Sequence, residues 1–150
     1  MTDPLGHTTT YQYDALDQLI EVKQDSYVSG LDGDLEKVNQ MNITRYERDL
    51  LGRVISVTDA ENQKETYAYD VRGQLVEKLD KDGYLTKYAY TKQGDVANVQ
   101  YADSKTVAMS YNALRQLTQV SDWLGATKIE VNPLGRTTKV EDHNYLRCGL

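Results

Sequence analysis

Apolar and polar residues alternate along most of the chain, most clearly where tyrosine recurs at every second position. In the stretch YAYDVRGQL, residues 67–75, Tyr67 and Tyr69 fall on one face of an extended strand, whereas Ala68 and Asp70 fall on the other. Segments that come after such stretches are rich in β-branched residues, as in LIEV at 19–22, VISV at 54–57 and LTQV at 117–120. No segment shows a convincing helical period, so the pattern predicts a β protein.

The alternating stretch occurs six times. The copies are YQYDALDQLIEV at 11–22, RYERDLLGRVISV at 45–57, YAYDVRGQLVEK at 67–78, YAYTKQGDVANV at 88–99, MSYNALRQLTQV at 109–120 and IEVNPLGRTTKV at 129–140. The position of Gly73 is held in the other copies by Asp17, Gly52, Gly94, Arg115 and Gly135, at successive intervals of 35, 21, 21, 21 and 20 residues. The spacing predicts a repeat of about 21 residues, with an insertion in the first interval.

Each repeat contains two turns. The first, here called the repeat turn, has Asp or Asn at its first position and Gly at its fourth in its typical form, as a type I turn with a left-handed residue prefers. Asp70 is expected to accept hydrogen bonds from nearby backbone N–H groups, and Gly73 to supply a positive φ. Arg115 makes its turn the least favourable of the six. The second, the return turn, is read as DPLG at 3–6, DAEN at 59–62, DKDG at 80–83 and DWLG at 122–125.

The insertion spans roughly residues 25–42. Its segment DLEKVNQM could form a short helix with Leu35, Val38 and Met41 on one side. We favour a lengthened hairpin, because adding equal numbers of residues to two paired strands extends them outward and restores the repeat afterwards.

The expected fold is all-β. Consecutive antiparallel hairpins form one large curled sheet over residues 1–150, a single region of about six repeats with about 12 strands and no significant helix. No helix covers its Tyr, Leu and Val face, so that face is expected to pack against its own continuation, another copy or a cargo. Unpaired edge strands also predict self-association.

Composition narrows the classes of function. The chain has 12 Tyr and one Trp but no Phe, which suits a sheet with one half-exposed face. Its net charge of -6 argues against a nucleic-acid partner. It has no run of about 18 apolar residues that would span a membrane, and MTDPLGHTTT at its start lacks the features of a signal peptide. The single cysteine, Cys148, excludes an intrachain disulfide.

The repeated motif resembles a known family. Tyr-x-Tyr-Asp-x-x-Gly-Arg-Leu is best preserved in YQYDALDQL and YAYDVRGQL, and LLGRV and PLGRT supply its Gly-Arg element. This pattern and its period resemble the YD (RHS) repeat of bacterial Rhs proteins, insecticidal Tc toxin components, cell-wall-associated Rhs-like proteins and animal teneurins. The resemblance extends from Asp3 to Asp142. Arg48 and Val131 depart from it at the second Tyr, and Thr91 departs from it at the Asp.

The resemblance implies hairpins that spiral into a hollow shell around a toxic C-terminal domain, or an extracellular barrel as in teneurins. It implies a secreted or cell-surface location, with the remaining shell repeats or a toxin cargo as partners, and a chain that is a fragment or short orphan of a longer shell. The expected function is therefore a non-enzymatic structural module. The residues expected to carry the motif are Tyr11, Tyr13, Asp14, Tyr46, Asp49, Gly52, Arg53, Tyr67, Tyr69, Asp70, Gly73, Tyr88, Tyr90, Gly94, Tyr111, Asn112, Asn132, Gly135 and Arg136.

The alternative in another class is a carbohydrate-binding or adhesive surface repeat, in which outward tyrosines and an exposed Trp123 contact a glycan. No catalytic, cofactor or metal site is predicted. Turn capping explains the repeated aspartates Asp14, Asp49 and Asp70 better than acid–base catalysis does. The acidic stretches DGDLE at 32–36 and DKDG at 80–83 lack the spaced ligands of a calcium loop, and His7 and His143 lack a second ligand at metal spacing.

Overall fold

The computed structural model describes residue 2, residues 8–29 and residues 35–142. Several predictions from the sequence lie outside these residues: the return turn at 3–6, the tip of the inserted hairpin at 30–34 with most of the acidic stretch at 32–36, and His7, His143 and Cys148.

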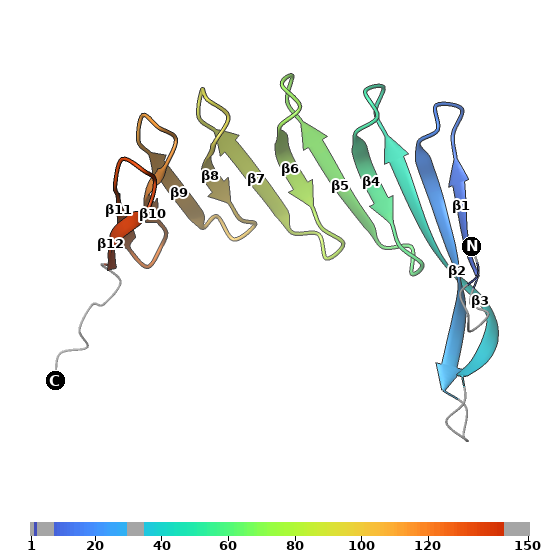
Figure 1. The fold of residues 1–150 in the computed structure, drawn as a ribbon. Coiled ribbons are helices and arrows are strands. Elements are labelled where there is room, and N and C mark those ends of the chain that lie inside the picture. The colour runs from blue at the N-terminus through green and yellow to red at the C-terminus, as the bar shows by residue number, and fades with distance from the viewer. Residues whose placement is uncertain (1, 3–7, 30–34, 143–150) are drawn as a thin grey trace. The chain divides into compact units, whose positions relative to one another are not determined.

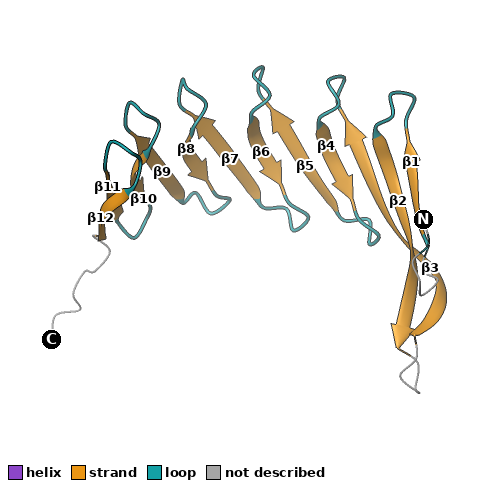
Figure 2. Ribbon diagram, in the orientation of Figure 1, coloured by secondary structure: helices purple, strands orange, loops and turns teal. Residues whose placement is uncertain are grey.

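The described residues form strands joined by turns, with no helix among them (Figure 2), so the predicted all-β fold class is confirmed. These residues consequently contain no helix of the length and hydropathy needed to cross a membrane. They make one antiparallel sheet of 12 strands whose order follows the chain. The strands are β1 (Thr9–Tyr13), β2 (Leu19–Ser29), β3 (Leu35–Arg48), β4 (Val54–Thr58), β5 (Lys64–Tyr69), β6 (Leu75–Leu79), β7 (Leu85–Tyr90), β8 (Val96–Gln100), β9 (Thr106–Tyr111), β10 (Leu117–Ser121), β11 (Ala126–Val131) and β12 (Thr137–Asp142).

The contacts divide the chain into two compact units. The first comprises Met1–Tyr67 and Leu79–Asp82, and the second comprises Ala68–Lys78 and Gly83–Leu150. In the first unit, each strand from β1 to β5 pairs with the next in antiparallel fashion. In the second unit the same holds from β7 to β12 (Figure 1). Each unit is therefore a simple succession of hairpins, without crossovers.

The register shifts by one residue beside the repeat turns. The shift falls between Gln12 and Tyr13 in the β1–β2 hairpin, and between Ala89 and Tyr90 in the β7–β8 hairpin. A turn whose fourth residue is left-handed places two residues of one strand opposite one residue of the other, which is a β-bulge. The bulge sets the direction of the side chain that ends the strand before the repeat turn, such as Tyr13 or Tyr90.

The insertion is a lengthened hairpin in its described part, and the segment that could have formed a helix is strand. β2 and β3 contain 11 and 14 residues, whereas the arms of the other hairpins contain five or six. Their pairing runs from Glu21 opposite Arg45 to Ser29 opposite Leu35, with one irregularity after Asp25.

The sheet buries few side chains deeply. Val99 and Ser56 are the most buried of the described side chains, with exposed fractions of 9% and 2%. Tyrosines of the central hairpins, such as Tyr69 and Tyr90, are half-buried, whereas Ala68 and Ala89 beside them are exposed. Because so little apolar surface leaves water, contacts between neighbouring repeats must contribute much of the order.

Candidate functional site

The repeat turns share one backbone geometry, seen in the turn of Asp70–Gln74, whose residues are here numbered 1 to 5. The N–H of residue 4, Gly73, donates to the carbonyl of Asp70 at 3.0 Å, and the N–H of Asp70 donates to the carbonyl of Gln74 at 2.9 Å. The Asp70 carboxylate accepts from the N–H groups of Arg72 and Gln74 at 2.8 and 2.9 Å. The same two backbone bonds occur in all six repeat turns.

Residues other than the favoured Asp and Gly also fit this geometry. Asp17 and Arg115 hold position 4 with φ of 58° and 62°, close to the 82° of Gly73. At position 1, Thr91 uses its hydroxyl to accept from the N–H of Asp95 at 3.1 Å. Each departure keeps the turn, because the backbone bonds do not depend on the side chain.

The turn carboxylates already have structural partners. Asp14 and Asp49, like Asp70, each accept from two N–H groups of their own turn. Asp49 also binds the Arg53 guanidinium at 2.6 Å. Partial burial of Asp49 opposes ionisation, but the hydrogen bonds from the side chain and backbone of Arg53 outweigh it and lower the pKa of the carboxyl. These groups cap turns, and the described residues contain no cluster of three His, Cys, Asp or Glu suited to a metal.

The second tyrosine of the motif links neighbouring repeats. The Tyr90 hydroxyl donates to the carbonyl of Leu75 at 2.7 Å, and the Tyr111 hydroxyl donates to the carbonyl of Val96 at 2.8 Å. In both cases the acceptor is the residue directly after the preceding repeat turn. Partial burial raises the pKa of Tyr90, so its hydroxyl stays protonated and able to donate.

The two departures from tyrosine at this position behave differently. Arg48 replaces the tyrosine hydroxyl with its guanidinium, which donates from Nε to the carbonyl of Leu19 at 3.2 Å and from Nη1 to the carbonyl of Gly52 at 2.9 Å. Leu19 is the residue directly after its repeat turn, so the acceptor is equivalent. Val131 has no donor and cannot make this bond.

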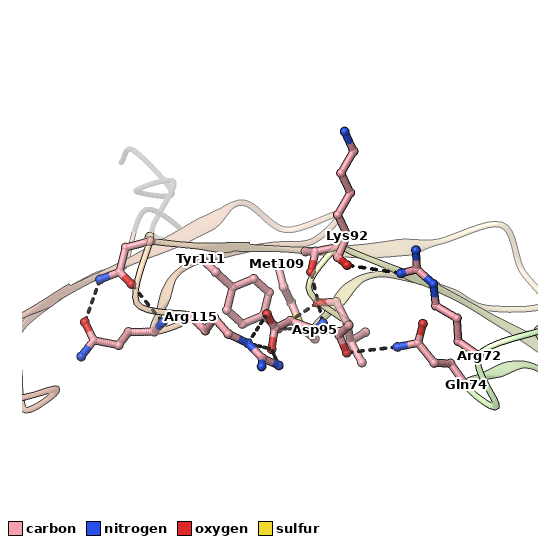
Figure 3. Close-up of polar contacts among 12 residues, drawn as sticks. Arg72, Gln74, Lys92, Asp95, Met109, Tyr111 and Arg115 are labelled. Atoms are coloured by element: carbon pink, nitrogen blue, oxygen red, sulfur yellow. Dashed lines mark hydrogen bonds and ion pairs between the residues drawn. The ribbon is translucent and has the colours of Figure 1, made fainter.

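A second set of contacts connects residue 5 of one repeat turn to residue 4 of the next, and we call it the turn ladder. The Gln74 amide donates to the carbonyl of Gly94 at 3.2 Å (Figure 3). A Cβ atom on Gly135 would lie 2.9 Å from Nε2 of Gln116, so the side-chain amide of the preceding repeat fills the space that a larger residue would need. Glycine is thus favoured at position 4 both for its positive φ and for its small size.

In one step of the turn ladder, both positions have a different residue type. Arg115 stands at position 4, and residue 5 of the preceding turn is Asp95 in place of glutamine. Arg115 Nη2 lies 2.7 Å from Oδ1 of Asp95 and its Nε lies 3.0 Å from Oδ2, a bidentate pair that Figure 3 shows. The hydrogen bond from Arg115 lowers the pKa of Asp95, and that pairing raises the pKa of Arg115.

The return turns lack this uniformity. The turn at Tyr101–Lys105 was not recognised in the sequence, because it has neither Asp at its first position nor Gly at its fourth, where Ser104 has a φ of 67°. The 21-residue spacing from Asp80 through Tyr101 to Asp122 was the signal that could have found it.

Trp123 belongs to the return turn Asp122–Gly125, and its side chain packs against the neighbouring return turn Tyr101–Lys105. Its ring meets Tyr101 edge to face, with centroids 6.4 Å apart, and Lys105 Nζ lies 5.1 Å from the indole centroid. Its exposed fraction is still 52%. A contact of Trp123 with an external ligand stays a prediction.

The remaining motif residues lie along the strands. Tyr46, Tyr67 and Tyr88 are half-buried, and the Tyr67 hydroxyl donates to Glu65 at 2.6 Å. Tyr11 and Tyr13 in β1 are exposed, at 44% and 54%. Besides Tyr90 and Tyr111, the residues that join one repeat to the next include four to which sequence analysis assigned no such role, namely Arg48, Gln74, Asp95 and Arg115. The signal was the coupled departure of Asp95 and Arg115 from the usual Gln and Gly.

A similar succession of strands occurs among solved structures. The crystal structure of TcdB2-TccC3 without its hypervariable C-terminal region has a similar fold, with a TM-score of 0.70 and 17% identity over 86% of this chain. A structure of the Photorhabdus luminescens Tc holotoxin pore gives a TM-score of 0.48 and 11% identity over 90% of this chain. The chain spans 7% and 9% of the lengths of those two chains. No curated protein sequence matches it.

Two family models match the sequence. The RHS repeat model matches residues 1–26, and the teneurin YD-shell model matches residues 32–145. The second match covers most of the chain, including every described strand from β3 onward. The repeats are therefore structural shell repeats, and the chain belongs to the teneurin YD-shell family.

Proposed function

We propose that this chain is a non-enzymatic segment of a β-shell that encloses or presents a toxin domain, in a toxin that is secreted or displayed at the cell surface. Its outer strands pair with further YD repeats. The observation that carries this proposal is that the repeated polar side chains serve structural roles. Tyr90 and Tyr111 bind carbonyls of the preceding repeat, and Asp70 and its equivalents cap turns. Side chains used in this way maintain a wall.

The likeness in fold to TcdB2-TccC3 supports the same proposal, since that structure carries a similar succession of strands. A wall built from hairpins also needs one face turned toward something, because few of the described side chains are deeply buried. A toxic cargo is the occupant that we propose.

The first test reads the DNA on both sides of the coding sequence. We expect further YD repeats upstream, and a toxin domain with an immunity gene downstream. Flanking genes that encode neither would contradict the proposal.

The second test purifies the protein from its own cells together with any domain bound to it, and then treats the complex with protease. We expect a toxic domain that resists digestion, and that becomes sensitive when Tyr90→Phe and Tyr111→Phe remove the links between repeats. Tyr101→Phe is the matched control, because this tyrosine lies in a return turn. A bound domain that is digested at the same rate in parent and variants would exclude enclosure.

A carbohydrate-binding surface is the second candidate, and one observation favours it. Three aromatic residues at return turns of the second unit are exposed, namely Tyr84, Tyr101 and Trp123, at 62%, 42% and 52%. Exposed aromatic rings can stack on sugars. Glycan binding by the isolated chain that Trp123→Ala abolishes would favour this function over the shell, and binding that the variant retains would exclude this use of Trp123.

A further inference from the structure

The tips of the repeat turns, which are positions 2 and 3, carry mainly apolar residues. Turn tips in proteins are usually polar, because they project into water. Here the apolar tip residues are Ala15 and Leu16, Leu50 and Leu51, Val71, Ala113 and Leu114, and Pro133 and Leu134. The other tip residues are Arg72, Lys92 and Gln93, so no repeat-turn tip contains an acidic residue.

The tips of the described return turns have a different composition. They carry Ala60 and Glu61, Lys81 and Asp82, Ala102 and Asp103, and Trp123 and Leu124. All but the last of these turns contain an acidic tip residue. Apolar tips without acidic residues are therefore a property of the repeat turns alone.

In the second unit, the apolar tips of the repeat turns are exposed to water. Val71 is fully exposed, and Leu114 and Leu134 are 66% and 79% exposed. We call the exposed apolar and cationic residues of these turns the repeat-turn rim, which comprises Val71, Arg72, Lys92, Leu114, Pro133, Leu134 and Arg136. Exposed apolar side chains that gather along one edge of a protein indicate a contact surface.

The repeat turns of the second unit also carry more cations than anions. The cations are Arg72, Lys92, Arg115 and Arg136, and the anions are Asp70 and Asp95, in a chain whose net charge is -6. Both carboxylates have partners within the turns, because Asp70 accepts from backbone N–H groups and Asp95 binds Arg115. The rim is therefore positively charged although the chain is acidic.

Two cations of the rim lie side by side. Arg72 Nη1 donates to the carbonyl of Lys92 at 3.2 Å, which holds the guanidinium beside the next repeat turn. The Lys92 side chain extends away from the sheet (Figure 3), and its ammonium makes no hydrogen bond or ion pair among the described residues. Two adjacent cations of this kind suit an anionic group such as a phosphate.

The geometry of the rim favours a fluid surface over a protein partner. A stable protein interface needs a continuous packed patch whose central side chains are removed from water. The rim instead presents single apolar side chains on separate turns, each two strands or about 10 Å from the next. Lipid headgroups can close around separate side chains, and anionic lipids also match the positive charge.

We propose that the repeat-turn rim of the second unit binds the surface of a membrane that contains anionic phospholipids. Val71, Leu114 and Leu134 enter the boundary between headgroups and acyl chains. Arg72 and Lys92 bind lipid phosphates. This contact goes beyond the proposed role in a shell and does not depend on a cargo.

The first test is cosedimentation of the full chain with vesicles of phosphatidylcholine, either alone or mixed with phosphatidylglycerol. We expect binding to the mixed vesicles that is at least about tenfold stronger than binding to pure phosphatidylcholine, and that weakens as added salt screens the charges. Arg72→Gln and Lys92→Gln should each weaken binding by about fivefold. Lys128→Gln is the matched control, because Lys128 is exposed in the middle of β11, and it should change binding by less than about twofold.

The apolar tips are tested with the same vesicles. Leu114→Ser and Leu134→Ser should each weaken binding by about tenfold, because each removes an apolar side chain from the lipid boundary. The matched control is Leu124→Ser, since Leu124 is 64% exposed but belongs to a return turn. In the second unit the return turns lie at the opposite ends of the strands from the repeat turns (Figure 1), so this variant should bind like the parent. Far-ultraviolet circular dichroism verifies the strand content of every variant.

The single tryptophan of the chain reports which turns meet the lipid. Trp123 belongs to a return turn, so its fluorescence emission should keep its wavelength when the mixed vesicles are added. The double variant Trp123→Phe with Leu114→Trp moves the only indole to the rim. Its emission should shift to shorter wavelengths when it binds.

Four outcomes would overturn the proposal. They are a parent that does not bind the mixed vesicles, equal binding to pure phosphatidylcholine, a loss in Leu124→Ser as large as that in Leu114→Ser, and a shift in Trp123 emission without one in the double variant. Association of the parent without vesicles that Leu114→Ser abolishes would assign the rim to a protein contact instead. The tip variants should leave protease protection of a cargo unchanged, so this proposal and the shell function fail separately.

Discussion

The repeat turns and the return turns connect strands of the same sheet, yet they differ in how strictly they are built. All six repeat turns close with the same two backbone hydrogen bonds. Among the described return turns, the one at Asp59 closes on Gln63, whereas the one at Asp122 closes one residue earlier, on Gly125. The turn at Tyr101 has no Asp or Asn at its first position, and Asp103 at its third position accepts from the N–H of Lys105 at 3.1 Å instead.

The difference reflects what each kind of turn contacts. Repeat turns contact their neighbours through Gln74 on Gly94 and Asp95 on Arg115, beside the half-buried tyrosine links. Return turns touch their neighbours through looser surface contacts, such as Lys81 on Asp59 at 3.5 Å. Exposed pairs of that kind contribute little to stability. Hydrogen-bonded contact between repeats therefore constrains the first kind of turn, whereas the second kind depends more on local turn chemistry and on side-chain packing such as that of Trp123 on Tyr101.

Valine at Gly94 gives the sharpest test of this difference and the largest expected effect. Valine at a φ of 94° is strained, and its Cβ would lie 3.3 Å from the Gln74 amide. We expect Gly94→Val to lower the free energy of unfolding by about 3 kcal/mol, combining backbone strain with the lost hydrogen bond. The measurement is denaturation in urea.

The matched control for that variant is Gly83→Val in a return turn. Gly83 has a similar φ of 84° but nothing within 4 Å of a Cβ atom. Strain alone should cost about 2 kcal/mol. Equal losses at Gly94 and Gly83 would show that the turn ladder adds nothing.

Removal of one tyrosine hydroxyl should have a smaller effect. Tyr111→Phe leaves the Val96 carbonyl without its donor, and we expect a loss of about 1 kcal/mol in unfolding free energy. Tyr101→Phe in a return turn keeps the ring contact with Trp123 and should change stability by less than about 0.5 kcal/mol. A loss at Tyr101 as large as that at Tyr111 would contradict the distinction.

Val131→Tyr should repair the missing link in the last hairpin. The residue directly after the preceding repeat turn is Leu117, whose carbonyl is the equivalent acceptor. We expect a gain of up to about 1 kcal/mol, measured as a rise in the denaturation midpoint. Val131→Phe adds the same ring without the hydroxyl, so a gain of the same size in that variant would attribute the effect to packing.

The smallest expected effect is the loss of stability in acid that comes from the Asp95–Arg115 step of the turn ladder. The hydrogen bond from Arg115 lowers the pKa of Asp95 from its ordinary 3.8, so the folded state binds this proton less readily than the unfolded state. The stabilisation is present above pH 3.8 and is lost as the pH falls through the lowered value. Asp95→Asn should therefore flatten the loss of stability below about pH 4. Asp59 and Asp103 in return turns also have lowered pKa values, so part of the loss of stability in acid should persist in the Asp95→Asn variant.

Much of the fold is encoded in local signals in the sequence. Alternation of Tyr67, Ala68 and Tyr69 predicted a strand, and Asp70 with Gly73 predicted the turn that the structure contains. The insertion could be interpreted as a hairpin because a pair of strands can lengthen without disturbing the repeats that come after it. The return turn at Tyr101 was missed because it has Tyr at its first position and Ser at its fourth, in place of the Asp and the Gly or Asn of the other return turns, and only the 21-residue period pointed to it.

The sequence alone determined the strands, the repeat turns and the family, because side-chain alternation and turn preferences act within a few residues and the period repeats them. Only the tertiary structure decided that Gln74 fills the space beside Gly94, that Asp95 binds Arg115, and that Arg48 replaces a tyrosine. Those pairs lie 20 or more residues apart in the chain and meet through antiparallel pairing and a bulge. The register between neighbouring hairpins decides whether these side chains meet, and the sequence of a single repeat does not contain that information.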